Sequence, residues 1–139
     1  MTQAYLIDPF VCEVTPIELR GEPGSSDERH FICTLLGCEQ IESVRPDKAG
    51  SDLIVIGGRD KVVGKTQEFF LCRLWPYNAI EGKALWIGVL PDGNNANPQN
   101  AIDYVRNQIA WAYRYSNQAY RLRPSTPARR LLRLRHARR

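Results

Sequence analysis

The chain has 139 residues, 43% of them hydrophobic, and a formal charge of +4, which is typical of one globular domain with its own core. Its longest apolar runs, DLIVIGG and ALWIGVL, are far shorter than the ~20 residues of a membrane-spanning helix. The N-terminus, MTQAYLIDPF, has neither the basic start nor the small-residue cleavage site of a secretory signal, so we expect a cytoplasmic protein.

The N-terminal part of the chain predicts two short strands and a helix. AYLI (4–7) and FVCEV (10–14) are the strands, and GEPGSSD (21–27) is a loop rich in Gly, Pro and Ser. We expect Ser26 or Asp27 to cap a helix over DERHFICTLLG (27–37), which ends at Gly37. Its apolar residues share one side and should pack on a sheet; they are Phe31, Ile32, Leu35 and Leu36.

The middle of the chain predicts a sheet. Strands are expected at 40–45, 52–56, 68–75 and 84–90, with a hairpin that runs from GGRD into KVVG through Gly57–Gly58. PYNAIEGK and PDGNNANPQN are expected to be connections. Together these patterns predict an α+β fold over about residues 3–95, with one small antiparallel or mixed sheet of five to seven strands and one packed helix.

A second helix is predicted from Asn97, as its cap, and Pro98, at its first helical position. Its apolar face is Ile102, Val105, Ile109 and Ala112, and a more aromatic face is Tyr104, Gln108, Trp111 and Tyr115. We therefore divide the chain into an α+β domain (1–97), a C-terminal aromatic helix (98–122) and an arginine-rich tail (123–139). The helix would dock on the sheet or pair two copies in a homodimer.

The charge is divided unequally between two parts of the chain. Residues 1–105, the acidic body, contain nine Lys or Arg and all fifteen Asp and Glu, a formal charge of −6. Residues 106–139 contain ten Arg, no Lys and no acidic residue. Such segregation indicates that the two parts have different roles.

Few residues fit a catalytic or metal site. The histidines are His30 and His136, and the sequence has no nucleophile elbow, Walker loop or dinucleotide-binding glycine motif. None of the four cysteines lies in a C-x-x-C pair, and His30, Cys33 and Cys38 provide fewer ligands than the four that zinc requires. We therefore expect the four cysteines to be buried or half-buried thiols. We expect no metal or cofactor, and a protein that is not an enzyme.

The basic segment predicts contact with nucleic acid. Arginine offers a planar, permanently charged group for phosphate oxygens, and neighbouring aromatic rings can stack on bases. The candidate phosphate contacts are Arg121, Arg123, Arg129, Arg130, Arg133 and Arg135, and the candidate stacking groups are Trp111 and Tyr115.

Other interpretations of the two parts stay open. The acidic body would bind and modulate a host protein, or the tail would be a solvated extension or fold back onto that body. In a third interpretation ARRLLRLRHARR (128–139) lies on a membrane surface, with Leu131, Leu132 and Leu134 as its apolar contacts.

Three segments carry a resemblance to a known family. AYLIDPF (4–10), LLGCEQIESVRP (35–46) and EGKALWIGVLPDG (81–93) occur in an order that resembles domain of unknown function 3846, a family of small phage- and plasmid-associated proteins. The resemblance covers about residues 4–105 and implies an α+β accessory protein of a mobile genetic element. It brings no catalytic residues. The chain departs from the family at GGRDK, where members are more acidic, and in its C-terminal extension.

Overall fold

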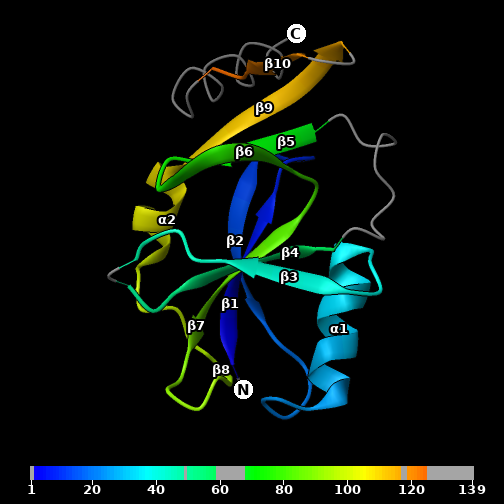
Figure 1. Ribbon diagram of the computed structural model, residues 1–139, viewed down its shortest axis with the longest axis vertical. Coiled ribbons are helices and arrows are strands. Elements are labelled where there is room, and N and C mark those ends of the chain that lie inside the picture. Colours follow the sequence, from blue (N-terminus) through cyan, green and yellow to red (C-terminus); the bar gives the residue numbers. More distant parts are fainter. Residues whose placement is uncertain (1, 49, 59–67, 117–118, 125–139) are drawn as a thin grey trace, which may run out of the picture.

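The computed structural model describes residues 2–48, 50–58, 68–116 and 119–124. These residues form two antiparallel sheets and two short helices (Figure 1). The predicted turn from GGRD into KVVG lies almost wholly outside the described residues, as does most of the arginine-rich tail.

The larger sheet has the strand order β2-β1-β7-β4-β3, with β8 paired to β7, and the smaller has the order β10-β9-β5-β6. The larger sheet contains β1 (Gln3–Asp8), β2 (Glu13–Glu18), β3 (Ile41–Val44), β4 (Leu53–Gly57), β7 (Ala84–Val89) and β8 (Asn95–Ala96). The smaller sheet contains β5 (Glu68–Cys72), β6 (Trp75–Glu81), β9 (Ile109–Ser116) and β10 (Ala119–Leu122). The fold is therefore mostly β and only loosely α+β, and the prediction of a single sheet is wrong.

The predicted first helix is confirmed as α1 (Ser26–Leu36). Its cap is Ser25 rather than Ser26 or Asp27, because the Ser25 hydroxyl accepts a hydrogen bond from the Glu28 N–H at 3.2 Å. Gly37 ends the helix in the left-handed region, with φ of +69°. The buried side of α1 packs on one face of the larger sheet, as expected.

The second face of the larger sheet packs against the smaller sheet. Side chains of β7 point alternately to the two faces of the larger sheet. Leu85 and Ile87 belong to the core cluster beneath α1, whereas Ala84 and Trp86 belong to the cluster between the sheets. The cluster between the sheets also holds Ile7, Val14, Ile54, Phe70, Cys72, Ile80, Val105, Ile109 and Trp111. β7 is thus buried on both faces, which explains its unbroken apolar sequence.

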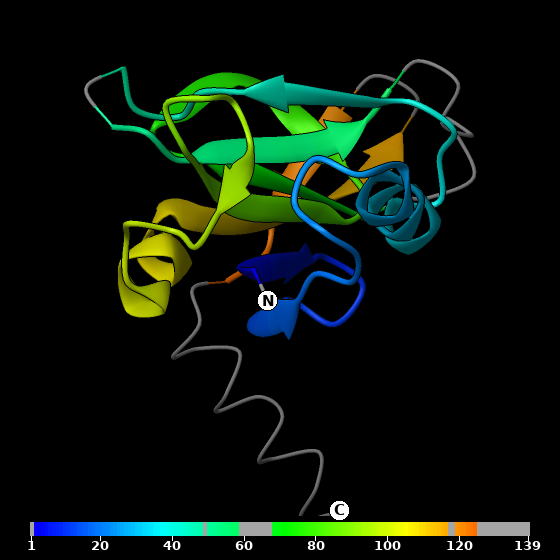
Figure 2. The same cartoon turned by 90° about the horizontal axis from the view of Figure 1, so that it is seen from below.

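The predicted C-terminal helix over 98–122 is wrong. Only Ile102–Gln108 is helical (α2), and the chain continues as β9 and β10. Asn97 does not cap the helix; its side-chain oxygen accepts a hydrogen bond from the Gln3 N–H at 2.7 Å. Because β9 pairs with β5 in the smaller sheet, residues 98–122 do not form a segment separate from the predicted domain. Helices α1 and α2 lie on opposite sides of the molecule (Figure 1, Figure 2).

The buried carboxylate of Asp52 holds the loop that leads into α2. Asp52 is 2% exposed and accepts hydrogen bonds from Trp86 Nε1 at 2.7 Å and from the backbone N–H groups of Gln99 and Asn100 at 2.9 and 3.1 Å. The Tyr5 hydroxyl donates to the Asn100 carbonyl at 2.8 Å. Burial, and secondly the nearby Asp52 charge, raise the pKa of Tyr5. This network links β1, β7 and the start of α2.

No helix in the described residues is long and apolar enough to cross a membrane.

Candidate nucleic-acid interface

Strands β9 and β10 form an antiparallel hairpin that carries the aromatic and basic residues of the C-terminal part. Tyr120 lies opposite Arg114, Arg121 opposite Tyr113, and Leu122 opposite Ala112. The ladder continues to Arg123, whose N–H donates to the Trp111 carbonyl at 2.7 Å. Because side chains alternate along a strand, Trp111 and Tyr113 lie on the inner side of this hairpin, and Ala112 and Arg114 lie on its outer side.

The inner side of the hairpin is occupied by contacts within the protein. Trp111 is 7% exposed, and its ring meets Phe70 edge-on with centroids 6.5 Å apart. Further along, the Arg123 guanidinium lies 4.7 Å from the centre of the Tyr113 ring and forms an ion pair with Glu68 at 2.5 Å. These residues stabilise the sheet, so their side chains have little capacity left for a ligand.

The outer side presents a cation beside two aromatic rings that contact each other. The Arg114 guanidinium lies 5.0 Å from the ring centre of Phe69 and 5.7 Å from that of Tyr120. The two rings meet edge-on, with centroids 4.7 Å apart. Tyr120 is 48% exposed and Leu122 is also exposed, whereas Phe69 is buried. We call Phe69, Arg114, Tyr120 and Leu122 the outer patch.

The outer patch combines the two chemical features that a flexible nucleic acid needs. The Arg114 guanidinium lies over aromatic rings and keeps its N–H donors, which can bind a phosphate oxygen. No acidic residue in the described ranges forms an ion pair with Arg114. The exposed ring of Tyr120 beside it can stack on a base.

The predicted site residues have different positions in the structure. Arg121 is exposed in β10, as a phosphate contact requires, whereas Arg123 is half-buried and paired with Glu68. Trp111 is in the core, so its predicted stacking role is wrong: a base cannot reach its ring without opening the two sheets. Tyr115 lies in β9, but its side chain is outside what the structure describes. Arg129, Arg130, Arg133 and Arg135 also lie outside the described residues.

Sequence reasoning did not single out Arg114 and Tyr120 as a unit. They come together only through the β9–β10 register, which shifts between Ala119 and Tyr120. A weaker signal was present in IAWAYRYS (109–116), where large residues alternate with Ala, Ala and Arg. That period of two is typical of a strand and places Arg114 on the side opposite Trp111.

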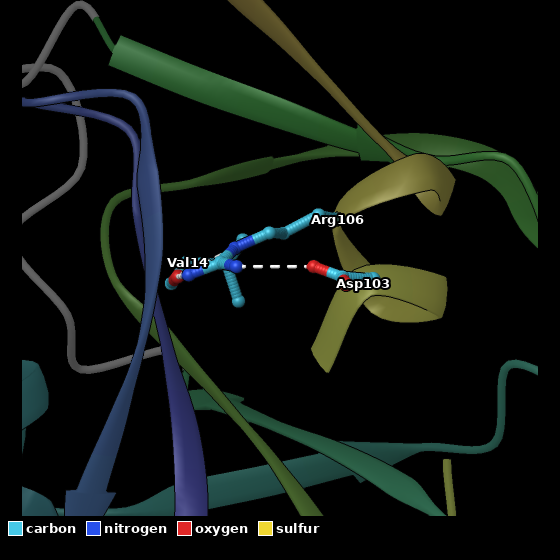
Figure 3. Close-up of polar contacts among 3 residues, drawn as sticks. All are labelled: Val14, Asp103 and Arg106. Carbon is cyan, nitrogen blue, oxygen red and sulfur yellow. Dashed lines mark hydrogen bonds and ion pairs between the residues drawn. The ribbon is translucent and has the colours of Figure 1, made fainter. Parts of the chain in front are cut away.

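Arg106 belongs to the basic part of the chain but is used to attach α2 (Figure 3). Its Nε and Nη2 donate to the Val14 carbonyl of β2 at 3.1 and 2.9 Å, and Nη1 donates to Asp103 at 3.2 Å. Asp103 is on α2 with Arg106, whereas Val14 is on β2. The two hydrogen bonds to Val14 therefore join α2 to the larger sheet. Arg106 is therefore excluded from the proposed interface.

Replacing Arg106 by alanine is expected to lower the free energy of unfolding by about 1–2 kcal/mol, because the Val14 carbonyl loses both donors. Urea denaturation followed by tryptophan fluorescence would measure the loss. Asp103→Ala is the matched control: it removes only the bond within α2 and should leave the midpoint nearly unchanged. Equal effects of the two substitutions would contradict this role of Arg106.

Among the described residues, no three His, Cys, Asp or Glu side chains converge in a way that could hold a metal ion.

Comparison of the chain with protein-family models, with curated proteins and with solved structures found no match. The resemblance to domain of unknown function 3846 therefore stays a prediction.

Proposed function

We propose that the protein is a non-enzymatic accessory protein that binds single-stranded nucleic acid through the outer patch and the arginine-rich tail. The observation that carries the proposal is the Arg114 guanidinium packed against Phe69 beside the exposed ring of Tyr120. Its setting in a mobile genetic element rests on the family resemblance alone.

The charge distribution supports different roles for the arginine-rich tail and the outer patch. Six of the ten C-terminal arginines follow residue 124, and no acidic residue is among them. Such a segment neutralises phosphates without reading sequence, and the released counterions make its affinity depend steeply on salt. The outer patch adds stacking, which a single strand with accessible bases can use and a closed duplex cannot.

The first test compares the full chain with a form that ends at Pro124, on labelled single-stranded and duplex oligonucleotides of mixed sequence. Ending there retains the pairing of Arg123 with Glu68 and Trp111. With about five phosphate contacts, raising salt from about 50 to 200 mM should weaken single-strand binding by about a hundredfold, and the shortened chain should bind weakly at both salt concentrations. Absence of binding by the full chain at low salt would contradict the proposal.

A paired substitution tests the outer patch itself. Tyr120→Ala should weaken single-strand binding by about fivefold to a hundredfold and change duplex binding little. Tyr77→Ala is the matched control, since Tyr77 is a 71% exposed tyrosine on β6, at the opposite edge of the same sheet. Equal effects of the two substitutions, or no effect of either, would remove the outer patch from the interface and leave only the tail.

A second candidate function, binding of a host protein by the acidic body, is favoured by the turn between β1 and β2. Phe10 and Val11 are adjacent and about half exposed there, and Glu13 begins the next strand. An apolar pair beside acidic groups fits a protein surface better than a polyanion. Host-protein binding that survives removal of the tail and is lost in Phe10→Ser would support this function instead.

A further inference from the structure

Two of the four cysteines are brought together by the way α1 ends. The Cys38 N–H donates to the Cys33 carbonyl at 3.0 Å, and the Gly37 N–H donates to the Thr34 carbonyl at 3.3 Å. Together with the left-handed conformation of Gly37, this pair of bonds is a Schellman motif. The side chains at the first and last positions of this loop, here Cys33 and Cys38, are frequently in contact in such motifs.

The hydrogen bond also limits how far apart the two cysteines can be. The path from the Cα of Cys38 through its nitrogen, the 3.0 Å bond and the Cys33 carbonyl to the Cα of Cys33 spans at most about 7 Å even if straight. Because the real path is bent, the separation lies within the range that a disulfide can bridge. Two cysteines five residues apart in a straight helix would point to different sides.

The side chains are directed toward the same place. The Cys33 thiol donates to the Glu39 carbonyl at 3.5 Å, so it points past the end of the helix toward the segment that carries Cys38. Both residues line one surface hollow of about 750 Å³ along α1. Cys33 is only 8% exposed, whereas Cys38 is half-buried and therefore more accessible from solvent.

We propose that Cys33 and Cys38 form a reversible disulfide and are a redox modification site of this protein. The Cys38 thiolate attacks a sulfur of a low-molecular-weight disulfide such as oxidised glutathione, which releases one thiolate and leaves a mixed disulfide. The Cys33 thiolate then attacks the Cys38 sulfur and releases the second. The protein loses two protons and two electrons, and the oxidant is reduced to two thiols.

The remaining cysteines provide internal references. Cys72 is fully buried between the sheets, and burial raises the pKa of its thiol, so little of it is present as the reactive thiolate. Cys12 packs against the same core cluster, at the side of the molecule away from the hollow beside α1. We therefore expect oxidation to spare both of these thiols under conditions that close the Cys33–Cys38 loop.

Trypsin separates the Cys33–Cys38 pair from Cys12 and from Cys72, which makes the test direct. Cleavage after Arg29 and Lys48 yields His30–Lys48 with both Cys33 and Cys38, since trypsin does not cut between Arg45 and Pro46. The full chain would be equilibrated with glutathione at graded ratios of reduced to oxidised form, quenched with acid, alkylated and digested. We expect this peptide alone to lose both alkyl labels and about 2 Da, in a single two-electron step.

Variants at Gly37 test whether the helix end brings the cysteines together. Gly37→Ala disfavours the left-handed conformation, although a Cβ there would meet no atom within 4 Å, and should lower the equilibrium constant for loop closure about fivefold. Gly37→Asn accepts that conformation more readily and should stay near the natural chain. Single Cys33→Ser and Cys38→Ser variants should give only mixed disulfides with glutathione.

Three outcomes would overturn the proposal. In the first, the peptide His30–Lys48 keeps two alkyl labels at every ratio. In the second, it accumulates glutathione adducts without an internal link. In the third, the equilibrium constant for closure is no larger in the folded chain than in guanidinium-unfolded chain, which would show that the fold does not bring Cys33 and Cys38 together.

Discussion

Gly88→Ala is expected to lower the free energy of unfolding by about 3 kcal/mol or more. A Cβ built on Gly88 would lie 2.1 Å from the Asn97 carbonyl oxygen and 2.9 Å from its carbon. Both are backbone atoms, in the segment where β8 pairs with β7, so no side chain can rotate away to make room. Relief requires moving the β8 segment, and with it the bond from the Gln3 N–H to Asn97.

The matched control for this substitution is Gly50→Ala. A Cβ on Gly50 would come no closer than 3.5 Å to any atom, and those atoms belong to the Asp47 side chain, so its effect should stay within about 0.5 kcal/mol. Urea denaturation of both variants, followed by tryptophan fluorescence and by circular dichroism, measures the difference. Similar midpoints for the two variants would mean that β8 shifts at little cost and that its pairing with β7 contributes little.

Asp52→Ala is expected to cost about 3–5 kcal/mol, because its one buried carboxylate accepts hydrogen bonds from Trp86, Gln99 and Asn100. Trp86 Nε1 and the Gln99 and Asn100 N–H groups would lose their acceptor in places where water has little access. Asp52→Asn keeps one acceptor oxygen but replaces the other with an NH2 group, which cannot accept a hydrogen bond. We therefore expect a smaller loss than for Asp52→Ala.

The control for Asp52 is a carboxylate with a similar bond at the surface. Asp92 accepts a hydrogen bond from the Asn94 N–H at 2.9 Å in an exposed turn, where water can replace the acceptor. Asp92→Ala should therefore cost less than about 1 kcal/mol. If Asp52→Ala and Asp92→Ala had equal unfolding midpoints, the buried network would not hold the loop that leads into α2.

Elements with strong local signals were predictable from the sequence. The helix over DERHFICTLLG has acidic residues at its start, an apolar side and a glycine at its end, and all three act within the segment itself. ALWIGVL is a continuous apolar run that is long enough for a buried strand but too short for a buried helix. PYNAIEGK (76–83) was predicted to be a connection, but most of it belongs to β6, and the predicted strand over 68–75 is divided between β5 and β6. Pro76 disfavours a strand, yet β6 is at the edge of its sheet, where proline is tolerated.

The C-terminal part was mispredicted because two periods overlap in one stretch. Ile102 and Val105 have helical spacing, and Ile109 and Ala112 extend it by coincidence, while IAWAYRYS alternates with a period of two. Pairing with β5 decides the outcome, and that contact joins residues about forty positions apart. The outer patch depends on the same non-local register, so no local pattern could reveal that Arg114 meets Phe69 and Tyr120.

The central position of β7 also determines when the protein can fold. Its neighbours in the sheet are β1, from the first residues of the chain, and β4, so the middle of the larger sheet closes only after residue 89 has been made. Until then the hairpin of β1 and β2 leaves Ile7 and Val14 exposed, because the core cluster that covers them includes residues as late in the chain as Trp111. Such distant pairings place folding in the slow, millisecond-to-second range, and on the ribosome nearly the whole chain must emerge before its first strand is covered.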